Sequence, residues 1–101
     1  MELGTAISGR VLTLSLRGEL DHHGAQGLIR RVEREIESSL PLELVLDMGG
    51  VSFMDSSGIA LVIRSRRRME ELHGTLQLAN VPPQPRKVLE ASGVARLMNI
   101  Q

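Results

Sequence analysis

The chain alternates between segments with the apolar spacing of β-strands and segments with the apolar spacing of α-helices, and this alternation constrains its fold most strongly. Residues 11–16 (VLTLSL) alternate apolar and polar side chains, which is typical of a half-buried strand. Further strand-like segments span residues 42–48 and 75–81, and a helix-like segment, residues 57–73, separates them. An earlier helix is indicated after Ala25, where apolar residues recur on one helix face: Leu28, Ile29, Val32, Ile36 and Leu40. Strands that alternate with helices are joined by crossovers, which predicts a largely parallel sheet.

Weaker signals complete the expected order of elements. A strand at residues 2–7 opens the chain, a short third helix follows the PPQP stretch at residues 85–91, and residues 94–100 (VARLMNI) can return as a last short strand. Residues 42–48 are almost continuously apolar, so we expect that strand to be covered on both faces and the two glycines after it to interrupt it. We therefore expect one α/β domain over residues 1–101, a mixed, mostly parallel sheet of four to five strands covered by about three helices.

Composition excludes several classes of function. The chain has 101 residues, enough for one core, and Phe53 is its one aromatic residue, so that core must be aliphatic. It has no cysteine, which excludes disulfides, thiol catalysis and cysteine-based zinc sites. No apolar run approaches the ~20 residues of a membrane span. The amino terminus also lacks the pattern of a signal peptide. We therefore expect a cytoplasmic protein that does not bind membranes.

The distribution of charge gives no sign of nucleic-acid binding. The formal net charge is zero. A basic run, RSRRR at residues 64–68, is spread around its helix and is followed at once by Glu70 and Glu71. Aromatic side chains that could stack on bases are missing from the run. A solvated helix face is the favoured interpretation, and we expect no direct contact with nucleic acid.

A polar cluster, DSSG at residues 55–58, lies where an apolar strand ends and the second long helix begins. A helix start leaves backbone N–H groups unpaired, and Asp55 or Ser56 can accept from them, which contributes about 0.5–2 kcal/mol. Capping does not require Ser57, whose hydroxyl would project outward at the edge of the sheet. Phosphate added there would meet free N–H groups and the positive end of the helix dipole. Capping alone and a phosphorylation switch both fit these residues, and capping is the commoner use of such a cluster.

Two segments of the chain resemble a known family. VLDMGGVSFMDSSGIALVI (residues 45–63) is similar to the signature of STAS domains, which occur in sulfate transporters and anti-sigma factor antagonists. RGELDHH (residues 17–23) is similar to the corresponding loop of the sporulation type of antagonist. With FMDSSG, these segments make nearly the whole chain resemble the phosphorylatable antagonists. Family members usually carry a further carboxyl-terminal helix, and we expect it to be absent from a chain that ends in MNIQ.

The resemblance implies a partner-switching function in transcription. It assigns the phosphoacceptor to Ser57, with Asp55 and Ser56 shaping the loop and Gly58 leaving the backbone open to a kinase or partner. The unphosphorylated protein would bind an anti-sigma factor that is itself a serine kinase, and this binding would release the sigma factor. Phosphorylation on Ser57 would end the binding, and a serine phosphatase would restore it. The protein would therefore be a substrate and a binding module, not an enzyme, and we expect no cofactor.

The alternative function is a regulatory or scaffold STAS domain that does not act on a sigma factor. GELDHH disfavours the scaffold, and the lack of a membrane segment disfavours a transporter module.

Asp21, His22 and His23 follow the second strand, so we expect them beside the Ser57 loop at one end of a parallel sheet. The resemblance places them in the partner-binding surface. Otherwise Asp21 caps the first helix and the histidines are solvated. No metal site is expected, because adjacent histidines point apart and no ligand spacing recurs. A Ser57–His22–Asp21 hydrolase is also disfavoured, since no nucleophile-elbow pattern surrounds the serine.

Ile59 and Ile63 lie four residues apart, outside the stripe of the second helix that should face the core. They begin close to Ser57, so we expect them, together with Arg67, to flank the phosphosite in a partner complex. The alternative is that neighbouring loops partly cover them.

Overall fold

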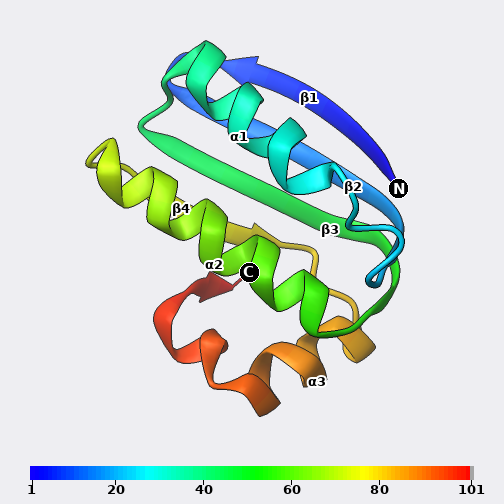
Figure 1. Cartoon of the computed structure of the whole chain (residues 1–101). Helices are drawn as coiled ribbons and strands as arrows, with labels where there is room; N and C mark the ends of the chain where they lie inside the picture. The colour runs from blue at the N-terminus through cyan, green and yellow to red at the C-terminus, as the bar shows by residue number, and fades with distance from the viewer. Residues whose placement is uncertain (101) are drawn as a thin grey trace.

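The protein folds as a sheet with helices packed on one face, as the computed structural model shows (Figure 1). The structure describes residues 1–100, so the last residue of the expected domain, Gln101, lies outside the described residues. The elements follow in this order: β1 (Glu2–Ser8), β2 (Val11–Leu20), α1 (Leu28–Ser39), β3 (Glu43–Met54), α2 (Ser56–Glu71), β4 (Thr75–Ala79), α3 (Pro83–Ser92), the 3₁₀ helix η1 (Val94–Leu97) and β5 (Asn99–Ile100).

The sheet confirms the expected mixed, mostly parallel architecture. Its five strands lie in the order β1-β2-β3-β4-β5. β1 and β2 form an antiparallel hairpin, whereas β2, β3, β4 and β5 pair in parallel. Parallel neighbours need crossover connections, and α1, α2 and α3 supply them. In Figure 1, α1 and α2 lie side by side across one face of this sheet. Within residues 1–100, no helix is long and apolar enough to cross a membrane.

The core lies between the sheet and the helices, and only one face of the sheet contributes to it. Leu44, Leu46 and Met48 of β3 are completely buried, whereas Val45 and Asp47 between them are half-buried. β2 and β4 show the same alternation. The expectation that β3 is covered on both faces is therefore wrong. The apolar residue Val45 instead pairs laterally with Thr13 and Gln77 on the face that bears no helix.

The two glycines in β3 do not interrupt the strand, contrary to expectation. β3 continues through Gly49 and Gly50 to Met54, and its pairing with β2 changes register beside them. A Cβ atom at position 50 would lie 2.8 Å from the carbonyl oxygen of Leu16, closer than ordinary packing allows. Gly50 therefore lets the two strands approach each other at the register change. β2 is also longer than expected, because it continues beyond the alternating residues 11–16 and ends at Leu20.

The first helix also ends differently from the expected pattern. Leu28, Val32 and Ile36 are buried as expected, but Leu40 is 53% exposed. Leu40 is the residue after the helix, and its backbone is left-handed with φ of 46°. This conformation turns the Leu40 side chain away from the buried face of α1. The helical pattern of buried residues therefore ends at Ile36 and does not include Leu40.

Most arginines of the basic run on α2 form ion pairs with glutamates of the same molecule. Arg64 pairs with Glu33 of α1 at 3.1 Å, and Arg68 pairs with Glu37 of α1 and with Glu71. Arg66 pairs with Glu70 one turn along its own helix. These exposed pairs agree with the interpretation of the run as a solvated helix face, and each contributes little to stability.

Candidate functional site at the start of helix α2

Two loops begin side by side at the carboxyl ends of β2 and β3. The last residues of these strands, Leu20 and Met54, are paired neighbours in the sheet. The N–H of Asp55 donates to the carbonyl oxygen of Leu20 at 3.2 Å, which ties the start of one loop to the start of the other. The parallel pairing therefore brings the loop after β2, residues 21–27, beside the DSSG cluster.

Asp55 caps α2. One carboxylate oxygen, Oδ1, accepts from the N–H of Ser57 at 2.7 Å, and the Asp55 carbonyl accepts from the N–H of Gly58 at 3.0 Å. Two of the backbone donors at the helix start are thus already taken, and fewer N–H groups are free for an added phosphate than the sequence suggested. The Asp55 carboxylate also lies close to the backbone of Ser57, where it would repel a second anion.

The Ser57 hydroxyl is available to solvent. Among residues 1–100, no hydrogen bond involves the side chain of Ser57 or of Ser56. Ser56 is exposed and Ser57 is half-buried, and the Ser57 hydroxyl oxygen is not fully enclosed by other atoms. Neither hydroxyl contributes to capping, so that role belongs to Asp55 alone.

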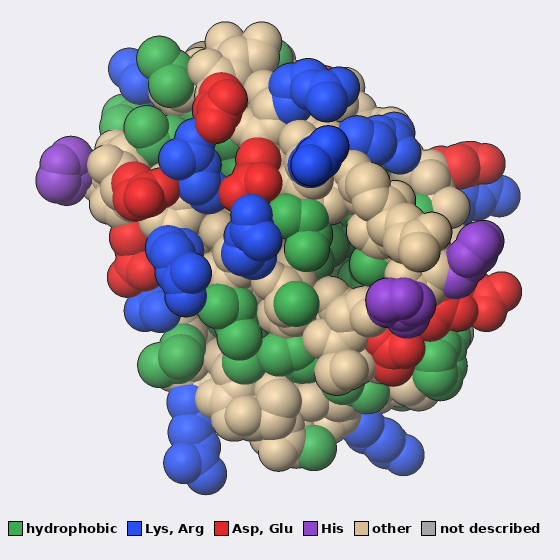
Figure 2. Space-filling model, viewed as in Figure 1, with side chains coloured by type: hydrophobic (Ala, Val, Ile, Leu, Met, Phe, Trp, Pro, Cys, Tyr) green, Lys and Arg blue, Asp and Glu red, His purple; other side chains and the backbone are tan. Residues whose placement is uncertain are grey.

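An open depression of about 220 Å³ lies between the first turns of α1 and α2. It is lined by His22, Ala25, Gln26, Ile29, Ser57 and Ala60. The fold thus brings Ser57 and His22 to one shared hollow. Figure 2, viewed onto the helices, shows hydrophobic side chains exposed on this face and histidine side chains projecting at its side.

Asp21 stabilises its own loop rather than a helix. Its Oδ1 accepts from the N–H of Gly24 at 2.7 Å, while α1 begins after Gly27 without a side-chain cap. His22 and His23 are exposed. Because the Asp21 carboxylate binds the backbone of Gly24, its geometry does not support the Ser57–His22–Asp21 hydrolase. Of the two histidines, His22 lines the depression beside Ser57.

Ile59 and Ile63 differ in exposure. Ile63 is 39% exposed on α2, so it can contact a partner. Ile59 is half-buried and packs against the core, in line with the alternative that neighbouring residues partly cover it. Ile63 is therefore the apolar side chain of this pair that is free to act at a protein interface.

Gly58 has a different role from the one the resemblance implied. It is buried, and a Cβ atom there would lie 2.3 Å from Cγ of Met54 and 3.0 Å from Cδ2 of Leu20. A buried residue cannot offer its backbone to a kinase. Glycine at this position instead lets the first turn of α2 pack directly on the end of β3.

Two residues near the site were not singled out by sequence reasoning. Phe53, the one aromatic side chain, is 42% exposed directly before the buried Met54. Strand alternation could have indicated its outward direction. Gln84 of α3 hydrogen-bonds to both backbone groups of Met54. No sequence pattern signals that contact, because 30 positions separate the two residues.

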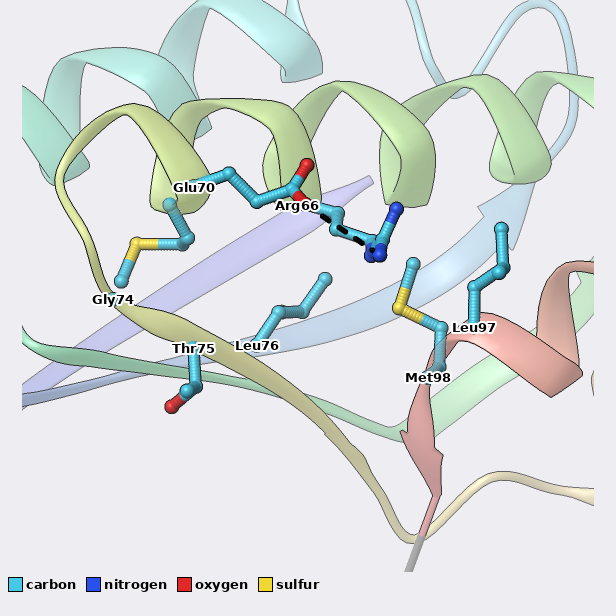
Figure 3. A pocket seen from close by; sticks show the side chains of 8 residues that line it. Arg66, Glu70, Gly74, Thr75, Leu76, Leu97 and Met98 are labelled. Atoms are coloured by element: carbon cyan, nitrogen blue, oxygen red, sulfur yellow. Dashed lines mark ion pairs between the residues drawn. The ribbon is translucent and has the colours of Figure 1, made fainter.

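A second hollow, of about 200 Å³, lies at the other end of α2 (Figure 3). Arg66 and Glu70 border it from α2, and Leu97 and Met98 border it from the η1–β5 segment. Arg66 is nine residues beyond Ser57, about 14 Å along the helix. This hollow contains none of the predicted site residues, so the candidate site is the one at Ser57.

Comparison with known proteins shows which family this chain resembles. The model of the STAS domain family matches residues 3–101. The anti-sigma F factor antagonist of Lysinibacillus sphaericus is 33% identical over 92 residues, which cover 91% of this chain and 79% of that protein. The antagonist of Paenibacillus polymyxa is 29% identical over 90 residues, covering 89% and 77% of the two chains.

Solved structures show the same likeness. The unphosphorylated form of the anti-sigma factor antagonist SpoIIAA superposes with a TM-score of 0.83 at 30% identity, covering 99% of this chain and 88% of that one. The phosphorylated form of SpoIIAA from Bacillus superposes with a TM-score of 0.74 at 30% identity, covering 99% and 91%. The chain belongs to the STAS domain family.

Proposed function

We propose that this protein is an anti-sigma factor antagonist that is switched off by phosphorylation on Ser57. The observation that carries the proposal is the position of the Ser57 hydroxyl. It has no hydrogen-bond partner among residues 1–100, it borders the depression with His22, and it precedes the exposed Ile63 on the same helix. The relatives described above are named as antagonists of anti-sigma factors, and a phosphorylated form of SpoIIAA has been solved.

In this function the unphosphorylated protein binds an anti-sigma factor that is also a serine kinase. The docking surface combines Asp21, His22 and His23 of the loop after β2 with Ile63 of α2, while the half-buried Ile59 supports Ile63 from the core side. Binding displaces the sigma factor, which then joins RNA polymerase. A serine phosphatase resets the switch. We place these steps in the cytoplasm, where RNA polymerase works.

Electrostatics explains how phosphate would end the binding. A phosphoserine carries about −1.5 to −2 charges at neutral pH. At Ser57 this charge would lie beside the Asp55 carboxylate, which already accepts from the Ser57 N–H. The added anion would therefore remain solvated at the surface rather than being neutralised. A partner that covers Ser57 would have to remove that solvation, which weakens the complex, while the fold itself stays intact.

The test uses two matched serines. The full chain is incubated with ATP and the anti-sigma F factor that the Lysinibacillus sphaericus relative antagonises, and phosphate is located by mass spectrometry. We expect label on Ser57 in the wild type and in Ser56→Ala, and none in Ser57→Ala. Binding is then measured with phosphoserine incorporated at position 57 during synthesis, and we expect at least a tenfold loss of affinity. Label on Ser56, or equal binding of both forms, would contradict the switch.

A further inference from the structure

Gln84 forms two hydrogen bonds to the backbone of the residue that precedes the DSSG cluster. The N–H of Met54 donates to Oε1 of Gln84 at 2.8 Å, and Nε2 of Gln84 donates to the carbonyl oxygen of Met54 at 2.9 Å. A primary amide carries one acceptor and donors in the same plane, as a peptide group does. The Gln84 side chain therefore pairs with Met54 as a neighbouring strand would.

The position of this contact in the sheet explains why it matters. β4 pairs with β3 only from Glu43 to Asp47, so the last part of β3 has no β4 neighbour. β2 pairs with the other side of β3 as far as Met54. Gln84 thus takes the place of the missing strand at the final residue of β3. Met54 is completely buried, so its backbone groups need partners that the fold itself supplies.

Gln84 is itself held firmly. It is the second residue of α3, and the prolines before it restrict the backbone at the start of that helix. Pro85 and Leu89 of α3 are buried, and Leu89 belongs to the common core. The side chain thus joins an anchored helix to the strand end from which the phosphosite loop departs.

We propose that Gln84 is the positioning residue of the Ser57 loop. Its two hydrogen bonds hold the peptide groups on both sides of the Met54 Cα atom, and so fix the direction in which the chain leaves the strand at Asp55. Asp55 in turn orients Ser57 through the cap. Gln84 touches no reacting atom, so it acts through Met54 and Asp55. The proposal rests on the function proposed above for the role of Ser57 as the phosphoacceptor. The effect of Gln84 on the position of this loop can be measured in the isolated protein.

The first test measures backbone amide exchange by NMR in the full chain. We expect Gln84→Ala to lower the protection of the Met54 and Ser57 amides at least tenfold, while the amides of Leu44 and Leu46 keep their protection. Gln77→Ala is the matched control. It removes another glutamine beside β3, one whose side chain bonds to Glu43, and it should leave Met54 and Ser57 unchanged. Unaltered protection of Met54 and Ser57 in Gln84→Ala would overturn the proposal.

Gln84→Glu tests the two-bond geometry directly. A protonated carboxyl group offers one donor and one acceptor, like the amide it replaces, whereas a carboxylate only accepts and would face the Met54 carbonyl oxygen. Asp55, which follows Met54, adds a further negative charge, and Arg86 and Lys87 are the nearest charged residues along α3. The Met54 carbonyl oxygen and the charge of Asp55 disfavour the carboxylate, whereas the Met54 N–H and the two cations favour it. Because the carboxylate would face the carbonyl oxygen directly, we expect the net effect to be a raised pKa of the introduced carboxyl group in the folded protein.

The sign of the pH dependence follows from that raised pKa. The stability of Gln84→Glu should match that of the wild type below the ordinary pKa of glutamate, about 4.3, and fall progressively behind it as the pH rises. Urea midpoints of both proteins between about pH 4 and pH 8 measure the difference. A deficit that stays constant over this range would indicate lost packing alone and would contradict the paired hydrogen bonds.

The second test concerns phosphorylation. With ATP and the anti-sigma F factor used above, Gln84→Ala should take up phosphate on Ser57 at least tenfold more slowly than the wild type, and Gln77→Ala at the wild-type rate. Equal rates for Gln84→Ala and wild type would show that the contact does not position Ser57 for the kinase. If the wild type takes up no phosphate, the proposed function fails, while the amide exchange of Met54 and Ser57 still decides whether Gln84 orients this loop.

Discussion

Gly58 lies directly against Met54, because a Cβ atom at position 58 would come within 2.3 Å of the Met54 Cγ atom and 2.6 Å of its sulfur. Gly58→Ala would normally stabilise a helix interior by up to about 1 kcal/mol. Here the clash opposes that gain, since Cγ is held near the backbone and cannot move aside freely. We expect the overpacking to win and to lower the free energy of unfolding by about 1–3 kcal/mol, measured by urea denaturation.

Gly4→Ala is the control for that prediction. A Cβ atom at position 4 would lie 3.6 Å from Cβ of Ser15, which is an ordinary contact. The same change of residue should therefore leave the free energy of unfolding within about 0.5 kcal/mol of the wild type. A stability loss of equal size in both variants would show that the contact with Met54 is not the cause.

The cap formed by Asp55 gives a second prediction. Asp55→Ala removes the oxygen that accepts from the Ser57 N–H and should lower the free energy of unfolding by about 0.5–2 kcal/mol. Asp55→Asn keeps a side-chain oxygen in place and loses only the favourable charge at the helix start, worth about 0.3–1 kcal/mol. Thermal or urea unfolding of the two variants separates these contributions. Losses of equal size would mean that the hydrogen bond to Ser57 contributes nothing measurable.

Much of the fold follows from sequence periodicity alone. Alternation in β2 and the helical stripe of α2 identify the buried side chains, because each pattern depends on residues within one element. The neighbouring positions of the two loops follow as well, since parallel strands bring their carboxyl ends to one edge. These rules predict which segments meet near Ser57 without predicting individual contacts.

The remaining features depend on contacts between distant segments. The partner of Met54 is Gln84, which lies 30 positions along the chain, so this role appears in no local pattern. The one-sided burial of β3 was missed for a related reason. Val45 is apolar, but the lateral neighbours Thr13 and Gln77 cover it only partly, and only the assembled sheet shows which face carries the helices.

The exposed position of Ile63 leads to a prediction about binding. Ile63 is 39% exposed, so Ile63→Asp should leave the protein folded and lower the free energy of unfolding by about 1 kcal/mol. If α2 docks on the partner as proposed, a charge there would be desolvated, and affinity for the anti-sigma F factor should fall at least tenfold, measured by calorimetry. Leu97→Asp is the control, because Leu97 is 58% exposed beside the other hollow and should leave affinity unchanged. Unchanged binding by Ile63→Asp would remove this residue from the interface.

The end of α1 offers a variant that should stabilise the protein. Leu40 has φ of 46° and ψ of 59°, its N–H donates to the carbonyl oxygen of Ile36, and its side chain is 53% exposed. A left-handed backbone costs a residue with a Cβ atom about 1–2 kcal/mol, whereas the added freedom of glycine in the unfolded chain costs only about 0.4–1 kcal/mol. Nearly half of the Leu40 side chain is buried, and its loss offsets part of this gain, so Leu40→Gly should raise the free energy of unfolding by up to about 1 kcal/mol.

Urea denaturation of Leu40→Gly and Leu42→Gly tests the cause of this gain. Leu42 is similarly exposed, at 50%, but its φ is not positive, so glycine relieves no strain there and should lower stability. The difference between the two variants isolates the left-handed conformation from the loss of an exposed leucine. If Leu40→Gly were as destabilising as Leu42→Gly, the geometry at the end of α1 would not be strained, and the exposed leucine would instead contribute to the packing of α1.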